Sequence, residues 1–176
     1  MRKAMYLMGA LEDSDIEWLA ANGTALRLPQ GQVLVREGQA VDSLYVVLDG
    51  QLAVEAGGAR LATLLAGEVV GEISFVDSRP PLATATTLDA VRILAVRREA
   101  LQAKLSLDSK FAAHFYRALA IFLADRLRAT TTRMGYGPPE QDAAGEVGDE
   151  LSDDLMETVS QGTRRFDNLL RRVRGV

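Results

Sequence analysis

The sequence predicts a mainly β fold with flanking helices: a small double-stranded β-helix (jelly-roll) barrel followed by a long helix. Three observations predict a barrel or sandwich of short strands followed by helices, and the motif at residues 67–84, described below, selects the jelly roll. Apolar residues alternate with period two over residues 24–96, glycine-containing turn signals interrupt the alternation at short and regular intervals, and helical patterns follow from Arg98 onward. Many short antiparallel strands with glycine at the corners are typical of a jelly roll, and equally of other β-sandwiches.

The alternating region is preceded by a short helix over residues 5–22. Asp13, Ser14 and Asp15 offer oxygens for its N-cap, and Asn22-Gly23 end it. Seven strands are expected after it, at residues 24–28, 33–36, 43–48, 51–56, 60–65, 82–88 and 91–96. Asp49-Gly50 and Gly57-Gly58 are predicted hairpin turns, because glycine adopts the positive φ that such turns need.

Two helices follow the strands, a short one at residues 98–105 and a long one at residues 108–134 with Asp108-Ser109 as N-cap candidates. Apolar residues cover nearly the whole circumference of the long helix: Phe111, Ala112, Ala113, Phe115, Tyr116, Ala118, Leu119, Ala120, Ile121, Phe122, Leu123, Ala124 and Leu127. A helix lying on one barrel needs only one apolar stripe, so this helix is expected to bury a second face. We favour a homodimer through helix 108–134, since two-fold homodimers are the commonest assembly, over burial by the chain's own C-terminal segment.

The chain is predicted to divide into a core at residues 1–134, an acidic linker at 135–150 that opens with Pro138-Pro139, and a C-terminal amphipathic helix at 151–176. Apolar residues recur in this last helix at intervals of three and four: Leu151, Leu155, Val159, Gly162, Phe166, Leu170 and Val173. Such a narrow seam favours a docking helix, on the core or on a partner protein. An amphipathic membrane anchor is the alternative, and the acidic first half of the helix argues against it.

Composition narrows the function classes. The 176 residues carry a net charge of -4 and no cysteine, which excludes disulfides and thiol chemistry and argues against a nucleic-acid binder. The longest apolar stretch, residues 118–124, is too short to cross a membrane, and without a signal peptide the expected compartment is the cytoplasm. His114 is the only histidine, and no nucleophile–histidine constellation accompanies it, so the sequence does not indicate an enzyme.

The most informative stretch is residues 67–84. Two glycine-glutamate steps lead into one short helical turn, followed by a bend stiffened by Pro80-Pro81. A helix start behind a glycine loop gathers unpaired backbone N–H groups, here those of Ile73, Ser74 and Phe75, which suit a phosphate. The carboxylate of Glu72 is suited to accept hydrogen bonds from sugar hydroxyls.

This stretch resembles the phosphate-binding cassette of the cyclic nucleotide-binding domain family, which serves catabolite activator proteins and cyclic-nucleotide-gated kinases and channels. The family pattern is glycine-glutamate, a short helix, then proline-arginine-serine/threonine-alanine. Gly71-Glu72 match the first pair, Pro80 matches the proline, and Ala83-Thr84 match the close. Pro81 stands in place of the arginine and Leu82 in place of the serine or threonine. The resemblance covers residues 11 to about 133, and it implies that the long helix forms a dimer seam and closes over the nucleotide base.

The resemblance implies a stand-alone regulatory sensor with a degenerate cassette, which binds cyclic AMP or cyclic GMP weakly because the phosphate-binding arginine is replaced. The candidate ligand-binding residues are Gly71, Glu72, Ile73, Ser74, Arg79, Pro81, Leu82 and Ala83. Arg79 is the candidate to supply the missing charge, although two stiff prolines follow it. The apolar Pro81-Leu82 wall would suit a less anionic ligand.

The alternative function is a ligand-free scaffold for dimerisation and protein docking through the long helix and the C-terminal helix. Direct DNA binding, as in the catabolite activator branch, is not expected. It would need a helix-turn-helix after the long helix, where the sequence has an acidic linker and a single helix.

Overall fold

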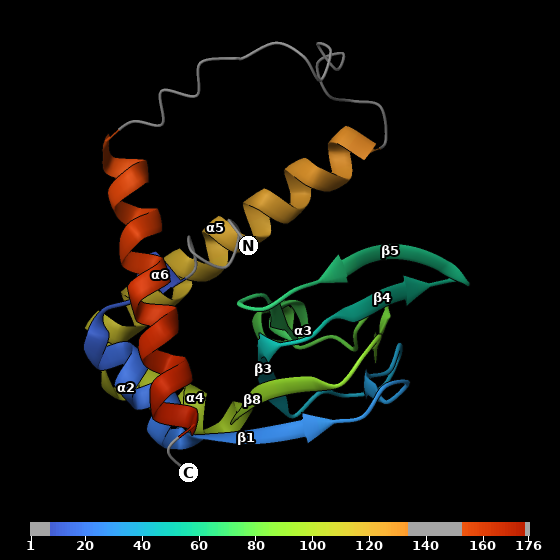
Figure 1. The fold of residues 1–176 in the computed structure, drawn as a ribbon, viewed down its shortest axis with the longest axis horizontal. Coiled ribbons are helices and arrows are strands. Elements are labelled where there is room, and N and C mark those ends of the chain that lie inside the picture. Colours follow the sequence, from blue (N-terminus) through green and yellow to red (C-terminus); the bar gives the residue numbers. More distant parts are fainter. Residues whose placement is uncertain (1–7, 134–152, 175–176) are drawn as a thin grey trace.

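The computed structural model describes residues 8–133 and 153–174, and the predicted linker at 135–150 lies outside them. In the described part, the strands form two four-stranded antiparallel sheets, ordered β1-β8-β3-β6 and β2-β7-β4-β5 (Figure 1). The strands are β1 Gly23–Leu28, β2 Val33–Val35, β3 Ser43–Asp49, β4 Leu52–Ala56, β5 Ala59–Leu64, β6 Val69–Val70, β7 Thr84–Thr87 and β8 Val91–Arg97. The jelly-roll architecture predicted from the sequence is confirmed.

Two differences from the expected strands concern the segment between β5 and β8. β6 was not expected, because two residues are too few to show alternation, and it pairs with Tyr45 and Val46 of β3. β7 is shorter than predicted and begins at Thr84, so Leu82 and Ala83 belong to the loop that precedes it. This loop and β6 both border the cavity described below.

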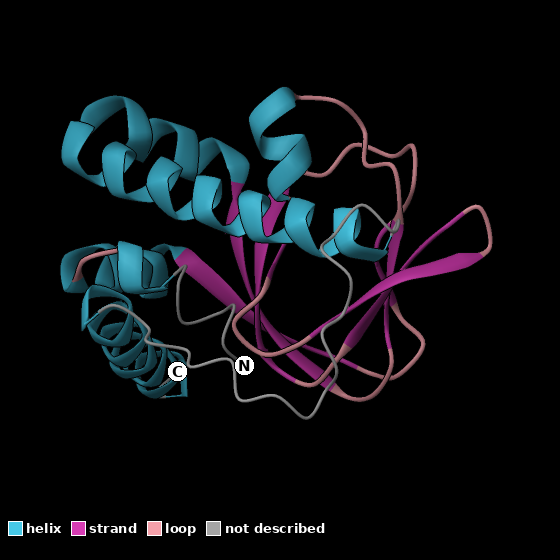
Figure 2. Ribbon diagram, turned by 90° about the horizontal axis from the view of Figure 1, so that it is seen from above, coloured by secondary structure: helices cyan, strands magenta, loops and turns pink. Residues whose placement is uncertain are grey.

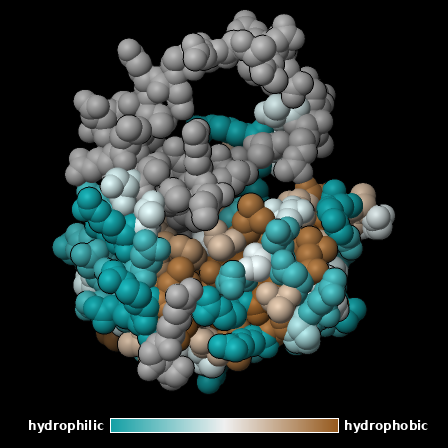
Figure 3. Space-filling model, in the orientation of Figure 1, coloured by the Kyte–Doolittle hydropathy of each residue, from teal (hydrophilic) through white to brown (hydrophobic). Residues whose placement is uncertain are grey.

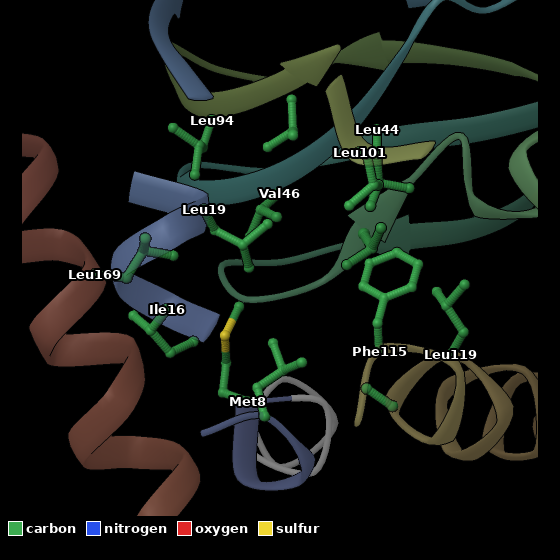
Figure 4. Packing of buried hydrophobic residues seen from close by; sticks show 14 of the residues in the cluster. Met8, Ile16, Leu19, Leu44, Val46, Leu94, Leu101, Phe115, Leu119 and Leu169 are labelled. Carbon is green, nitrogen blue, oxygen red and sulfur yellow. The ribbon is translucent and has the colours of Figure 1, made fainter. Parts of the chain in front are cut away.

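Successive residues of the first sheet point to opposite faces, and each face has its own core. Val47 and Ile93 pack between the two sheets, whereas Val46 and Leu94 face the helices. The helical layer lies on the outer side of the first sheet (Figure 2). In that second core, Leu19, Val46, Leu94, Leu101 and Phe115 come together from α2, β3, β8, α4 and α5 (Figure 4).

The helices are α2 Asp13–Asn22, α3 Glu72–Asp77, α4 Arg98–Leu107, α5 Ser109–Arg133 and α6 Asp153–Arg174. The helix predicted at residues 5–22 is interrupted: residues 8–10 are helical, and α2 begins at Asp13 with Glu12 at its N-cap position, where the Glu12 N–H donates to Asp15 Oδ2 at 2.7 Å. The predicted cap of α5 is confirmed: Asp108 Oδ1 accepts from the Phe111 N–H at 2.9 Å. The single histidine, His114, lies between α5 and α2, with Nδ1 2.9 Å from Asp15 Oδ2.

The C-terminal helix α6 packs on the chain's own core, alongside α2 (Figure 1). Leu169 is fully buried, and Phe166, Leu170 and Val173 pack against the same cluster. The seam therefore includes Leu169, which the predicted spacing left out. Polar contacts fix its register, because Arg165 donates to Asp13 Oδ1 at 3.0 Å and to the Gly9 carbonyl at 2.8 Å.

One face of α5 stays exposed in the single chain. Its inner face buries Phe111, Phe115, Ala118, Leu119 and Phe122 against the core. Its outer face carries Ala113, Tyr116, Ala120, Ala124 and Leu127, with Tyr116 52% and Leu127 68% exposed. Because α6 packs on α2, it does not cover this outer stripe in the described structure.

Candidate functional site

A cavity of about 250 Å³ opens between the second sheet, the α3 region and the C-terminal half of α5. Its floor belongs to the core between the sheets and includes Val35, Val54, Leu64, Val70 and Ala85. The other lining residues come from β5, the cassette and α5: Leu61, Ala62, Thr63, Glu68, Gly71, Glu72, Ile73, Ser74, Pro81, Leu82, Ala83, Arg126 and Thr130. The cavity thus joins the predicted cassette to the interior of the barrel.

Gly71 sets the direction in which the chain enters α3. Its φ of 92° lies in the left-handed region, and a Cβ there would stand 2.9 Å from the carbonyl oxygen of Ser43. Any larger residue would therefore strain the backbone and push α3 away from β3. This close approach places the next residue, Glu72, at the wall of the cavity.

The other end of α3 is held by Arg98, at the start of α4. Its guanidinium donates to the Ser74 carbonyl at 2.8 Å, to the Phe75 carbonyl at 3.3 Å and to Ser78 Oγ at 2.8 Å. These carbonyls lie at the C-terminal end of a short helix, where a cation is favourable. Arg98 thereby ties the cassette helix to the helical layer.

Glu72 is the most deeply buried acid of the site, at 2% exposure, and it forms an ion pair with Arg126 of α5. Burial raises the pKa of the Glu72 carboxyl, and the charge and hydrogen bond of Arg126 act in the opposite direction. The guanidinium also lies over the Phe122 ring, 5.7 Å from its centroid. Arg126 therefore compensates the buried carboxylate and closes α5 over the cavity.

The backbone donors expected at the start of α3 are only partly free. The Phe75 N–H donates to the Gly71 carbonyl at 3.0 Å as part of the helix, so it is not available to a ligand as expected. Ser74 contributes a different feature. Its Oγ is buried and has no hydrogen-bond partner among the described residues, although Ser74 lines the cavity.

Seven of the eight residues singled out from the sequence line this cavity, and Arg79 does not. Arg79 is exposed, and its N–H donates to Asp77 Oδ1 at 2.9 Å. Pro81 and Leu82 form the rim where the family pattern has its phosphate-binding residues, and Leu82 is 81% exposed. The structure adds Arg126 and Thr130 of α5, which the sequence pattern did not single out.

A jelly roll whose cavity carries a glycine-glutamate cassette and is closed by the following long helix defines a class of ligand-binding β-barrel domain. A family model, the cyclic nucleotide-binding domain, matches residues 25–108. The chain belongs to the cyclic nucleotide-binding domain family. No helix among the described residues is both long and apolar enough to span a membrane.

The N-terminal domain of a transcriptional regulator from Streptomyces coelicolor is 32% identical, with 72% of this chain and 91% of that domain covered and a TM-score of 0.58. The catabolite activator protein of Thermus thermophilus is 26% identical, with 74% of this chain and 62% of that protein covered and a TM-score of 0.62. The CRP-like cAMP-activated global transcriptional regulator of Mycobacterium tuberculosis is 27% identical over 129 residues, which are 70% of this chain and 56% of the relative. The chain thus spans little more than half the length of this curated relative.

Proposed function

We propose that this chain is a non-enzymatic regulatory module whose pocket descends from a cyclic nucleotide site and binds cyclic AMP or cyclic GMP only weakly. The observation that carries the proposal is a cavity that retains Glu72 and has Pro81 and Leu82 at its phosphate-side rim. A carboxylate has several acceptor positions, so Glu72 can accept from Arg126 and from a sugar hydroxyl together. The pocket can therefore hold the sugar without a matching group for the phosphate.

The charges of the cavity support weak binding of an anion. Its charged lining residues in the described structure are Glu68, Glu72 and Arg126, and Arg126 is already paired with Glu72. Loss of one member of a buried charge pair typically costs about 2–5 kcal/mol, or roughly 30-fold to several thousand-fold in affinity. Pro81 has no N–H and Leu82 no hydroxyl, so two neutral donors are missing as well.

Restoring the cation should restore binding. We expect calorimetric titration with cyclic AMP and cyclic GMP to give weak or no binding to the native chain. The Pro81→Arg variant should bind at least about 30-fold more tightly, because a guanidinium then meets the phosphate. Arg79→Ala is the matched control and should leave the titration unchanged, since Arg79 lies outside the cavity lining. Tight binding by the native chain would contradict the proposed degeneracy, and no binding by Pro81→Arg would favour the ligand-free scaffold.

We also propose that the module acts as a homodimer through helix α5, within the 108–134 segment, rather than by direct DNA contact. The exposed stripe on the outer face of α5 supports this, because apolar side chains at helical spacing are the usual content of a two-helix seam. The net charge of -4 is unfavourable for a DNA-binding surface. α6 packs Phe166 and Leu169 on the core of its own chain, so a protein partner would contact another face of this helix.

A charge placed in the proposed seam should separate the subunits. Leu127 is 68% exposed in the single chain, so Leu127→Glu is expected to leave the fold intact. In a dimer it would bury an unpaired carboxylate, at a cost of about 3 kcal/mol or more, and weaken association by at least about 100-fold. Light scattering coupled to size exclusion measures this. Gln102→Glu adds the same charge on the exposed surface of α4 and should leave the mass unchanged; a monomeric native chain would contradict the dimer.

A further inference from the structure

The charged groups that line the cavity are satisfied within the protein. Glu68 Oε2 accepts from the Leu65 N–H at 2.7 Å, in the turn that follows β5. Glu72 and Arg126 form an ion pair with each other. With all three groups ionised, the described lining therefore sums to one negative charge, and a ligand anion would find no free cation in it.

The uncharged part of the wall is mostly apolar. Val54, Leu64 and Val70 form the floor, and the exposed side chains of Leu61, Ile73 and Leu82 stand around the opening. Hydrophobic side chains reach the surface in the middle of the face shown in Figure 3, between more hydrophilic residues. Such a lining favours a ligand with an uncharged, largely apolar body, since removing an anion from water without a partner is costly.

One polar group of the site lacks a partner. Ser74 is 4% exposed. Among the buried side-chain oxygen and nitrogen atoms of the described residues, its Oγ is the one that forms no hydrogen bond. Buried hydroxyls in folded proteins are normally satisfied, so an unpaired one in a cavity wall points to a bound molecule. In this structure the Ser74 Oγ has almost no surface open to the cavity, so its χ1 torsion must turn to another staggered position, about 120° away, to aim the hydroxyl at a ligand.

We propose that this pocket takes an uncharged, hydroxyl-bearing ligand of the nucleoside type in preference to a cyclic phosphate, with the Ser74 hydroxyl as a hydrogen-bonding partner. The inference rests on the proposed function, which supplies the descent from a nucleotide site. The cavity volume of about 250 Å³ lies just below the range of about 300–1,000 Å³ for small-molecule sites, which favours a compact ligand. The absence of a free cation in the described lining favours a neutral ligand, and the unpaired hydroxyl adds one hydrogen-bonding group for it.

Adenosine and cyclic AMP are the matched probes, because they share the base and the ribose and differ in the charged ring phosphate. We expect calorimetry on the full chain to show adenosine binding at least about tenfold more tightly than cyclic AMP. Raising the salt from about 0.05 M to 0.5 M should leave adenosine binding unchanged, since no ion pair with the ligand is formed. In the Pro81→Arg variant the order should reverse in favour of cyclic AMP.

The Ser74→Ala variant tests the hydroxyl. It should weaken adenosine binding by about 3- to 10-fold, and it should raise the melting temperature of the ligand-free protein, because an unpaired buried hydroxyl is removed. Ser106→Ala, at an exposed serine of α4, is the control that should change neither quantity. A lower melting temperature with unchanged adenosine affinity would overturn the role of Ser74.

The outcomes separate this inference from the function on which it rests. Equal or tighter binding of cyclic AMP to the native chain overturns the neutral ligand and leaves a nucleotide sensor. Binding of cyclic AMP to Pro81→Arg, with no binding of adenosine to the native chain, also overturns the inference and leaves the degenerate cassette. No binding of either probe to either protein overturns both.

Discussion

Replacing Arg126 by methionine is expected to lower the free energy of unfolding by about 3–5 kcal/mol at pH 8, because it leaves a buried carboxylate without its partner. Glu72 is 2% exposed, so its carboxylate is largely removed from water in the folded chain. Methionine keeps an unbranched aliphatic side chain but removes the guanidinium, so the loss includes both the ion pair and the contact of the guanidinium with the Phe122 ring. Urea denaturation followed by circular dichroism measures it.

The stability lost in the Arg126→Met variant should depend on pH. Burial raises the pKa of Glu72 in the folded protein, and removing Arg126 takes away the main influence that lowers this pKa. In the variant, the folded state should therefore hold the proton at a pH where the unfolded chain has released it. Stability is then fully present below the ordinary glutamate pKa and declines as the pH rises through the raised pKa of the folded state.

The free energy of unfolding of the variant should consequently be closest to that of the native protein near pH 4–5 and furthest below it near pH 8. The double variant Glu72→Gln/Arg126→Met removes both charges and should lose this pH dependence. Arg128→Met, at an exposed position of the same helix, is the matched control and should change stability by less than about 0.5 kcal/mol. If Arg126→Met lowered the free energy of unfolding equally at every pH, the pair would contribute packing rather than charge compensation.

Most of the barrel could be predicted from the sequence because its signals are local. Ser43–Asp49 and Val91–Arg97 are rich in apolar and β-branched residues and are bounded by turn residues, which predicts strands, and glycine at the hairpins predicts positive φ. β6 could not be predicted in this way, since its two residues become a strand only by pairing with β3. The N-cap of α2 is Glu12 rather than one of the better capping residues that follow it, because Glu12 and Asp15 form a reciprocal capping box.

In the site too, residues with a local sequence signal could be predicted, and residues brought in by long-range contacts could not. The cassette motif identified Glu72 and the Pro81-Leu82 rim, since these residues are contiguous and carry the family pattern. The partner of Glu72 is 54 positions away, and only the direction in which α5 crosses the cavity selects Arg126. The unpaired Ser74 hydroxyl has no sequence signature, because a missing partner is a property of the packed structure.

In α6, the seam spacing favoured Phe166 and Leu170 and left out Leu169, the side chain that the core buries completely. A narrow heptad seam assumes one helix as the partner. The cluster that receives α6 instead includes Met8, Ile16 and Leu19, and a broader face of the helix, with Phe166, Leu169, Leu170 and Val173, packs on it (Figure 4). The register of α6 was therefore set by tertiary contacts rather than by its own period.

Leu169→Ala is accordingly expected to lower the free energy of unfolding by about 2–5 kcal/mol, because a buried leucine leaves a cavity when it is truncated. For a chain of this size, the melting temperature should fall by roughly 2–4 °C for each kcal/mol. Leu107→Ala, the same change at an exposed leucine that ends α4, should cost less than about 0.5 kcal/mol. Differential scanning calorimetry of the two variants compares them directly. If Leu169→Ala were as mild as Leu107→Ala, α6 would not be docked on its own core, and its apolar face would be free to bind a second protein.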